Sequence, residues 1–182
     1  MLAVGLTLTA CSSGPGSSDT VPDETSTSAV PTSTTILPPD TTTTTRGLIG
    51  VSTEFGRSVI EVAGVPYTVA VADTSDEHSR GLMGVEDVSP LDGMLFVFDD
   101  WVHRTFWMKD TFIPLDIAFF DRDGFLVNQT TMEPCVVDEC PVYRSEGAAQ
   151  YALEAPLGTL TDLPADARLV VIGSLDGSGK EI

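Results

Sequence analysis

Short β-rich segments separated by turn residues make up most of the chain beyond residue 57. Residues 58–64 and 66–72 alternate between apolar and polar positions or are rich in β-forming side chains, and Gly64 lies between them. This pattern predicts that the folded part of the chain opens with a β-hairpin.

A short helix is predicted directly after this hairpin. Thr74 and Glu77 have the spacing of a capping box, in which the Thr hydroxyl bonds the Glu amide and the Glu side chain reaches back. The helix is expected to run to about Met83, with Gly84 as its stop. His78 falls in the acidic start of this helix, where its ring is expected to be solvated.

Six further segments carry strand patterns. The first ends at Asp99-Asp100, and residues 121–124 read as a hairpin turn. Residues 160–163 are predicted to form a single helical turn. The six predicted strands are residues 94–98, 104–108, 115–120, 125–129, 151–154 and 169–173.

Taken together, seven or eight short strands and one or two short helices predict a mainly β domain, or a β-rich α+β domain. Their close spacing favours a small curled sheet or a barrel-like arrangement. A length of 182 residues allows one ordinary domain plus an extension. We expect residues 46–182 to form that single β-rich domain.

The first eleven residues read as a lipoprotein signal. Residues 1–10 are apolar or small and uncharged, and they are too few to span a bilayer. Leu8-Thr9-Ala10-Cys11, followed by two serines, resembles a bacterial lipobox, so Cys11 is the predicted site of lipid attachment. The segment lacks the basic residues that usually open such a signal, and the alternative is an apolar N-terminus with a chance cysteine.

A polar segment follows the predicted lipid site. Residues 12–45 contain 7 Ser, 11 Thr and 5 Pro, with four acidic residues and no basic one. Such a chain buries too little apolar area to offset its ordering entropy, so it is interpreted as a disordered tether. We therefore expect a lipid-anchored protein at the extracytoplasmic face of the cell membrane, with the lipid bilayer as a partner.

The net negative charge of the chain argues against partners that are themselves negatively charged. The chain has 27 acidic and 9 basic residues and a formal net charge of −18, which opposes binding to nucleic acid. Two His and three Cys argue against a metal site rich in these ligands, and no nucleotide-binding or zinc-protease motif occurs. The sequence therefore predicts no metal and no cofactor.

Several motifs follow one another in the middle of the chain. They are Arg80-Gly-Leu-Met83, Gly93-Met-Leu-Phe-Val-Phe98, Phe106-Trp-Met-Lys-Asp-Thr111, Ile113-Pro-Leu-Asp-Ile117, Met132-Glu-Pro-Cys135, Cys140-Pro-Val-Tyr-Arg-Ser145 and Ala149-Gln-Tyr-Ala-Leu-Glu154. In this order the motifs resemble domain-of-unknown-function family 192, and the resemblance covers roughly residues 58–175. It implies one compact β-rich domain, often exported and often lipid-anchored, and it implies no activity.

Asp116 is the most informative single residue of these motifs. It interrupts an apolar run, and a buried carboxylate is costly unless it is paired or accepts several hydrogen bonds. Strand alternation would place Trp107 and Lys109 on one face, which would suit a ligand platform beside Asp116. The alternative is a structural ion pair, which is the favoured interpretation. The candidate cluster, for either role, is Arg80, Trp107, Lys109, Thr111 and Asp116.

Cys135 and Cys140 are predicted to form a short disulfide, because export would place them in an oxidising compartment. The alternative is a redox pair. Their spacing is not Cys-x-x-Cys, and Asp138 and Glu139 would raise a thiol pKa rather than lower it, so the structural role is favoured.

These observations favour a binding or accessory module of the cell envelope, with an envelope protein or glycan as its ligand. One alternative is a hydrolase acting on an envelope glycan or peptide, with Asp116 as general acid or base beside Lys109. A purely structural domain is the third possibility. The residue pattern contains no recognisable catalytic triad, so no catalytic residue is assigned.

Overall fold

The computed structural model describes residues 50–174. The predictions for the signal, for Cys11 and for the whole tether fall on residues 1–49 and lie outside the described residues. The elements are β1 (Gly56–Val62), β2 (Val65–Ala72), α1 (Ser75–Arg80), β3 (Gly93–Trp107), β4 (Leu115–Phe120), β5 (Leu126–Met132), β6 (Val142–Pro156) and β7 (Leu169–Ser174).

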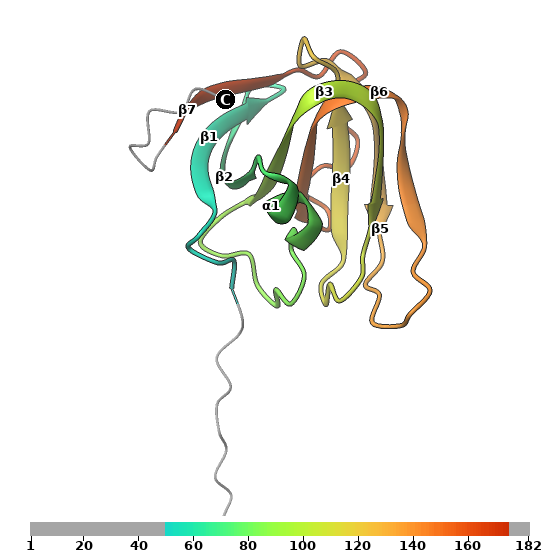
Figure 1. Cartoon of the computed structure of the whole chain (residues 1–182). Coiled ribbons are helices and arrows are strands. Elements are labelled where there is room, and N and C mark those ends of the chain that lie inside the picture. The colour runs from blue at the N-terminus through green and yellow to red at the C-terminus, as the bar shows by residue number, and fades with distance from the viewer. Residues whose placement is uncertain (1–49, 175–182) are drawn as a thin grey trace, which may run out of the picture. The chain divides into compact units, whose positions relative to one another are not determined.

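The seven strands form one curled sheet in the order β5-β4-β6-β3-β2-β1-β7 (Figure 1). Parallel pairing joins β2 to β3, and every other neighbouring pair is antiparallel. The sheet is not closed into a barrel, although a bridge between Phe125 and Arg168 brings the turn before β5 to the start of β7. The mainly β prediction is therefore confirmed, in its curled-sheet form.

Hydrophobic clusters cover both faces of the sheet. One contains Phe96 and Phe119, and the other contains Leu95 and Phe120, as strand alternation requires. Every residue of β4 is buried, since this strand runs through the middle of both clusters. Burying each large side chain contributes about 1.5–3 kcal/mol to folding, which makes β3 and β4 the centre of the domain.

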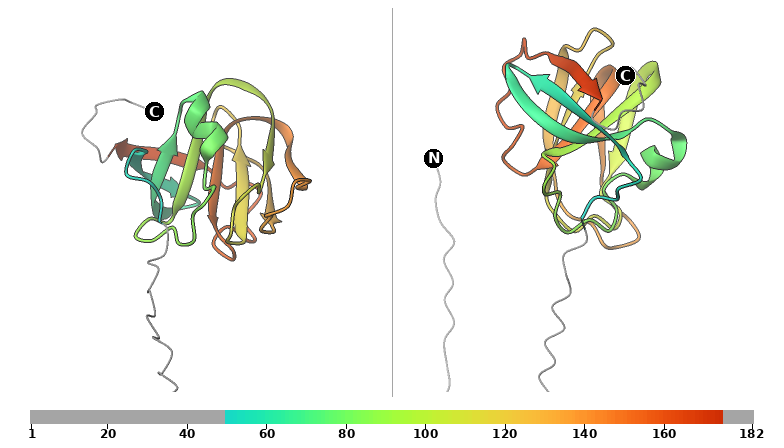
Figure 2. Two further views of the ribbon diagram at one scale, coloured as in Figure 1. Left: turned by 60° about the horizontal axis from the view of Figure 1, so that its bottom comes forward. Right: turned by 90° about the vertical axis from the view of Figure 1, so that its left-hand side faces the viewer.

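The predicted capping box is confirmed in α1. The Glu77 amide donates to the Thr74 hydroxyl oxygen at 3.3 Å, and the Thr74 amide donates to the Glu77 carboxylate at 3.0 Å. The helix ends at Arg80, three residues before the predicted end at Met83. Gly81 ends it with a φ of 45°, and a side chain there would meet the Phe96 ring at 3.2 Å. The helix lies beside β2 and β3 (Figure 2).

Two predicted strands, residues 94–98 and 104–108, are one long strand in the structure. β3 runs without a break through Asp99 and Asp100, where the sequence pattern indicated an end. β6 pairs with β3 on both sides of residues 98–101, which have no partner in the register and form an irregularity between Val97 and Val102. A second register shift follows His103. The predicted strand 151–154 is likewise only the last part of β6, whose first half was missed.

The predicted helical turn at 160–163 is wrong. These residues form a bend and a turn, because the Leu160 amide donates to the Asp116 carboxylate instead of to a helical carbonyl. The opening hairpin at Gly64 and the turn at residues 121–124 are both confirmed. Within residues 50–174, no helix has the length and hydropathy of a membrane span.

Candidate functional site

A cavity of about 320 Å³ lies between α1 with the residues after it and the middle of β3. Its lining combines aromatic rings with polar and charged side chains. The lining residues used below are His78, Arg80, Phe96, Phe98, His103, Arg104, Phe106, Trp107, Thr111 and Glu154.

Glu154 is the buried ionisable group of this cavity. It lies on β6 between Met94 of β3 and Ile117 of β4, and it is only 4% exposed. No hydrogen bond or ion pair joins its carboxyl to another residue of the described part of the chain. Burial among apolar neighbours raises the pKa of the Glu154 carboxyl to about 8, so it is mostly protonated at pH 7.

Gly93 of β3 allows this strand to approach β6 closely at Glu154. A side chain at Gly93 would lie 2.1 Å from the Glu154 carbonyl oxygen, inside any van der Waals distance. The close approach of β3 and β6 therefore requires glycine at this position, and it fixes the backbone from which the Glu154 side chain reaches the cavity.

Three phenylalanine rings form the aromatic wall. Phe106 meets Phe96 edge to face at 4.9 Å between ring centroids, and it meets Phe98 in the same way at 6.3 Å. Such pairs hold rings in defined orientations rather than loosely. Trp107 extends the wall to the rim, where it is 53% exposed. The cavity thus offers ring faces and edges to whatever enters it.

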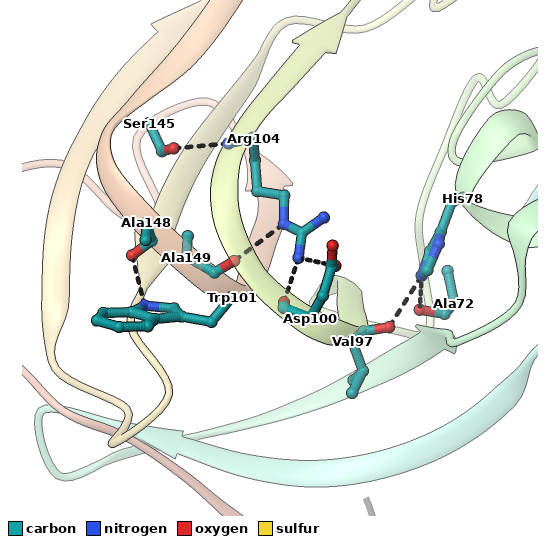
Figure 3. Close-up of polar contacts among 9 residues, drawn as sticks. All are labelled: Ala72, His78, Val97, Asp100, Trp101, Arg104, Ser145, Ala148 and Ala149. Atoms are coloured by element: carbon teal, nitrogen blue, oxygen red, sulfur yellow. Dashed lines mark hydrogen bonds and ion pairs between the residues drawn. The ribbon is translucent and has the colours of Figure 1, made fainter.

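Arg104 lines the cavity but directs its guanidinium to protein groups (Figure 3). Its Nε donates to the Ala149 carbonyl oxygen at 2.9 Å, and its Nη2 donates to the Asp100 carboxylate at 2.5 Å. The guanidinium carbon lies 3.8 Å from the centre of the Phe98 ring. The Arg104 amide in turn donates to the Ser145 hydroxyl at 2.8 Å, which fixes the strand beneath the side chain.

His78 is partly buried and held by protein groups, whereas the sequence predicted a solvated ring. Its Nε2 lies 3.0 Å from the Ala72 carbonyl oxygen and 2.9 Å from that of Val97 (Figure 3). Because both neighbours only accept, Nε2 must carry a proton. The ring also packs on Phe98 at 4.4 Å between centroids, so His78 ties α1 to β2 and β3.

The structure brings together three of the five residues of the candidate cluster. Arg80, Trp107 and Thr111 line the cavity, whereas Lys109 and Asp116 are not among its lining residues. Trp107 and Lys109 were expected to share a strand face. β3 ends at Trp107, so the alternation on which that expectation rested does not extend to Lys109.

Asp116 has a structural environment. It is 2% exposed and accepts from the Thr131 hydroxyl at 3.0 Å, the Gly158 amide at 2.7 Å and the Leu160 amide at 3.1 Å. The expectation that it accepts several hydrogen bonds is confirmed. It borders a separate hollow of about 180 Å³ that Gln129 also lines.

Lys109 is engaged with the disulfide loop. Its ammonium group donates to the Val137 carbonyl oxygen at 3.0 Å and lies 3.5 Å from the Asp138 carboxylate. The disulfide between Cys135 and Cys140 is formed, with Cα atoms 5.9 Å apart. Asp116 and Lys109 therefore have separate partners and do not form the acid–base pair of the hydrolase hypothesis.

The sequence analysis does not predict a site role for Glu154, which occurs there only as the last residue of the motif Ala149–Glu154. The signal was present, because Glu154 interrupts the apolar run Ala152-Leu-Glu-Ala155 as Asp116 interrupts its own run. Metal ligands are a separate question. In the described part of the chain, no group of three or more His, Cys, Asp or Glu residues is arranged to hold a metal ion.

Comparison with known proteins now identifies the family. The model of the DUF192 family, described as Uncharacterized ACR, matches residues 58–169. The chain belongs to this family. No curated protein sequence is detectably similar to the chain.

Two solved structures are similar to this DUF192 chain. A putative transcription regulator from Sinorhizobium meliloti 1021 is 29% identical, with a TM-score of 0.54, over 66% of this chain and 96% of that one. A protein of unknown function from Novosphingobium aromaticivorans DSM 12444 is 24% identical, with a TM-score of 0.57, over 67% of this chain and 90% of that one. The second likeness concerns the fold alone.

Proposed function

We propose that this DUF192 protein is a ligand-binding module of the cell envelope, anchored by lipid on Cys11, and that its ligand occupies the Glu154 cavity. The observation that carries the proposal is the unpaired Glu154 carboxyl, buried in the described domain at a cavity with an aromatic wall.

No fully enclosed side-chain nitrogen or oxygen of the described residues lacks a hydrogen-bond partner, so the unpaired Glu154 oxygens open onto the cavity. A ligand in the cavity can therefore supply the hydrogen bonds that the protein does not. The cavity volume of about 320 Å³ lies at the lower end of the range for small-molecule sites. Several rings and a few convergent polar groups are the usual lining of such sites.

Binding is better supported than hydrolysis. Glycoside hydrolysis usually uses two carboxyl groups on either side of the scissile bond. Among the described residues that line the cavity, Glu154 is the single carboxyl group. Asp116 is held by three donors at a separate hollow, which removes the acid–base pair that the hydrolase alternative required.

The envelope location rests on the lipobox-like segment at Cys11 and on the Ser/Thr/Pro-rich residues 12–45. The expected ligand is therefore a small metabolite of the cell envelope or a group that belongs to an envelope glycan or protein. Nucleic acid is not a proposed partner, since a net charge of −18 repels phosphates. For that reason a role in transcription, as in the name of the Sinorhizobium protein, is not proposed for this chain.

A screen of small molecules against the full chain tests the binding role. Compounds are ranked by thermal shift, and binding is then mapped by amide chemical shifts in NMR. We expect the responding amides to surround Glu154 and Phe98 rather than Asp116. The variant Trp107→Ala should fold and bind these compounds at least about tenfold more weakly, because a rim ring is lost.

Trp101→Ala is the matched control, because Trp101 lies on the same strand and is also exposed but does not line the cavity. It should bind like the wild type. Compounds that map elsewhere, or that bind Trp107→Ala as tightly as wild type, would contradict the proposal.

The anchor is tested separately by expression in a bacterial host with radiolabelled palmitate. Wild-type chain should incorporate the label and enter the detergent phase of Triton X-114, whereas Cys11→Ala should do neither. Labelled, membrane-bound Cys11→Ala would refute lipid attachment at this cysteine.

A further inference from the structure

We propose that the ligand of the Glu154 cavity is a compact organic amine, whose ammonium group pairs with the Glu154 carboxylate while its carbon frame packs on the aromatic wall. This inference rests on the proposed function, because it assigns the chemical class of the ligand that the cavity binds.

Glu154 lacks donors. An ionised carboxylate only accepts hydrogen bonds, and no donor of residues 50–174 reaches this one. An ammonium group has three N–H donors and a positive charge, so it satisfies both needs of a buried carboxylate. A neutral hydroxyl would supply a donor without the charge, and an anion would add repulsion.

The wall favours a cation as well. Phe96, Phe106 and Trp107 line the cavity, and aromatic ring faces attract cations, whereas the Phe98 ring is already covered by the Arg104 guanidinium. The attraction is larger where water is excluded, as at the buried end of the cavity. The hydrocarbon part of an amine gains contact with the same rings.

Two arginines also line the cavity, but their charges are engaged by other groups. Arg80 donates to the Glu54 carboxylate at 2.7 Å and lies over the Phe55 ring. Arg104 is paired with Asp100. Neither guanidinium is within hydrogen-bond distance of Glu154, so neither neutralises it.

The remaining neighbours of Glu154 and the two histidines of the cavity do not supply a positive charge that pairs with its carboxylate. The neighbours of Glu154 on β3 and β4 are the apolar Met94 and Ile117. His78 and His103 line the cavity, and the rings of both are held by backbone carbonyl oxygens. The acidic chain as a whole, with its net charge of −18, also raises the local concentration of cations.

Pairing with an amine has a measurable proton balance. The free carboxyl is mostly protonated at pH 7, since burial raises the pKa of Glu154 to about 8. When the ammonium binds, the carboxyl proton passes to solvent and the ion pair forms. Binding at pH 7 should therefore release about one proton per ligand. A neutral ligand that accepts from the protonated acid would release none.

The test uses three probes of one shape, namely benzylammonium, benzyl alcohol and benzoate, titrated calorimetrically into the full chain at pH 7. We expect benzylammonium to bind at least tenfold more tightly than the other two. Titrations in phosphate and in Tris, whose ionisation enthalpies differ, should show the released proton. Glu154→Gln should remove both the preference and the proton release, while Glu146→Gln, exposed on the same strand, should leave both unchanged.

Equal or reversed preference among the three probes would overturn the inference, as would benzylammonium binding without proton release or no binding by any of them. The proton measurement needs only the wild-type chain, so it does not depend on the folding of a variant. If other compounds from the screen bind at the cavity while benzylammonium has no advantage, the proposed function stands and the amine assignment fails.

Discussion

Replacing Glu154 by Gln should stabilise the folded chain increasingly as the pH rises. The unfolded chain releases the Glu154 proton near its ordinary pKa of 4.5, while burial raises the pKa of the folded carboxyl to about 8. Between these values the folded state holds a proton that the unfolded state has lost. Each pH unit in this window therefore lowers the free energy of unfolding by about 1.4 kcal/mol.

This contribution is fully present below pH 4.5 and is lost as the pH rises through 8. The loss amounts to about 3 kcal/mol at pH 7 and about 5 kcal/mol above pH 8. Gln does not ionise and is desolvated to a similar extent as the protonated acid, so Glu154→Gln escapes this loss. The variant should match the wild type near pH 4.5 and exceed its free energy of unfolding by these amounts at higher pH.

Urea unfolding of the full chain, followed by tryptophan fluorescence between pH 4.5 and 9, measures this difference. Glu146→Gln controls for the loss of a carboxylate at an exposed position on the same strand. A difference between Glu154→Gln and wild type that does not change with pH would refute the reasoning. So would a variant that is less stable than the wild type at pH 9.

Three further predictions concern the frame of the domain. Asp116→Asn should lower the free energy of unfolding by about 1–3 kcal/mol, since two amides and a hydroxyl lose a charged acceptor. It should leave binding at the cavity unchanged. Urea unfolding checks the first effect, and the NMR titration checks the second. The exported chain should show no reactive thiol at Cys135 or Cys140 after denaturation, because the two form a disulfide. Reducing that disulfide should lower the free energy of unfolding by about 2 kcal/mol. Two reactive thiols before reduction would contradict the disulfide. Thr74→Ala should cost about 1 kcal/mol in urea unfolding through loss of the helix cap, and an unchanged midpoint would count against the capping box.

Local features were predictable from sequence because their partners lie a few residues apart. The capping box joins Thr74 to Glu77, and the first hairpin turns at Gly64. In each case the residue type and its spacing determine the backbone conformation. The need of Asp116 for several donors could also be inferred, since its apolar neighbours in the chain predicted its burial. Which donors would satisfy it could not, because Gly158 and Leu160 are more than forty residues away.

The residues of the candidate site could be predicted only in part from the sequence. Arg80, Trp107 and Thr111 were selected as one cluster and do line one cavity. Lys109 was added by extending the strand alternation past Trp107, and the chain leaves the strand there. The sequence analysis predicts a site role for Asp116 and none for Glu154, although both interrupt apolar runs. Only the environment distinguishes them, because one carboxyl has three donors and the other has none in the described domain.

The sequence by itself determined that the chain has an acidic, β-rich domain with a polar segment before it, since composition and periodicity are properties of the chain alone. Tertiary structure decided that β3 and β6 pair on both sides of residues 98–101. It also decided that Glu154 meets a cavity beside α1 instead of a donor. The physical reason is that hydrogen-bond satisfaction depends on groups brought together across the fold, and spacing along the chain does not specify those groups.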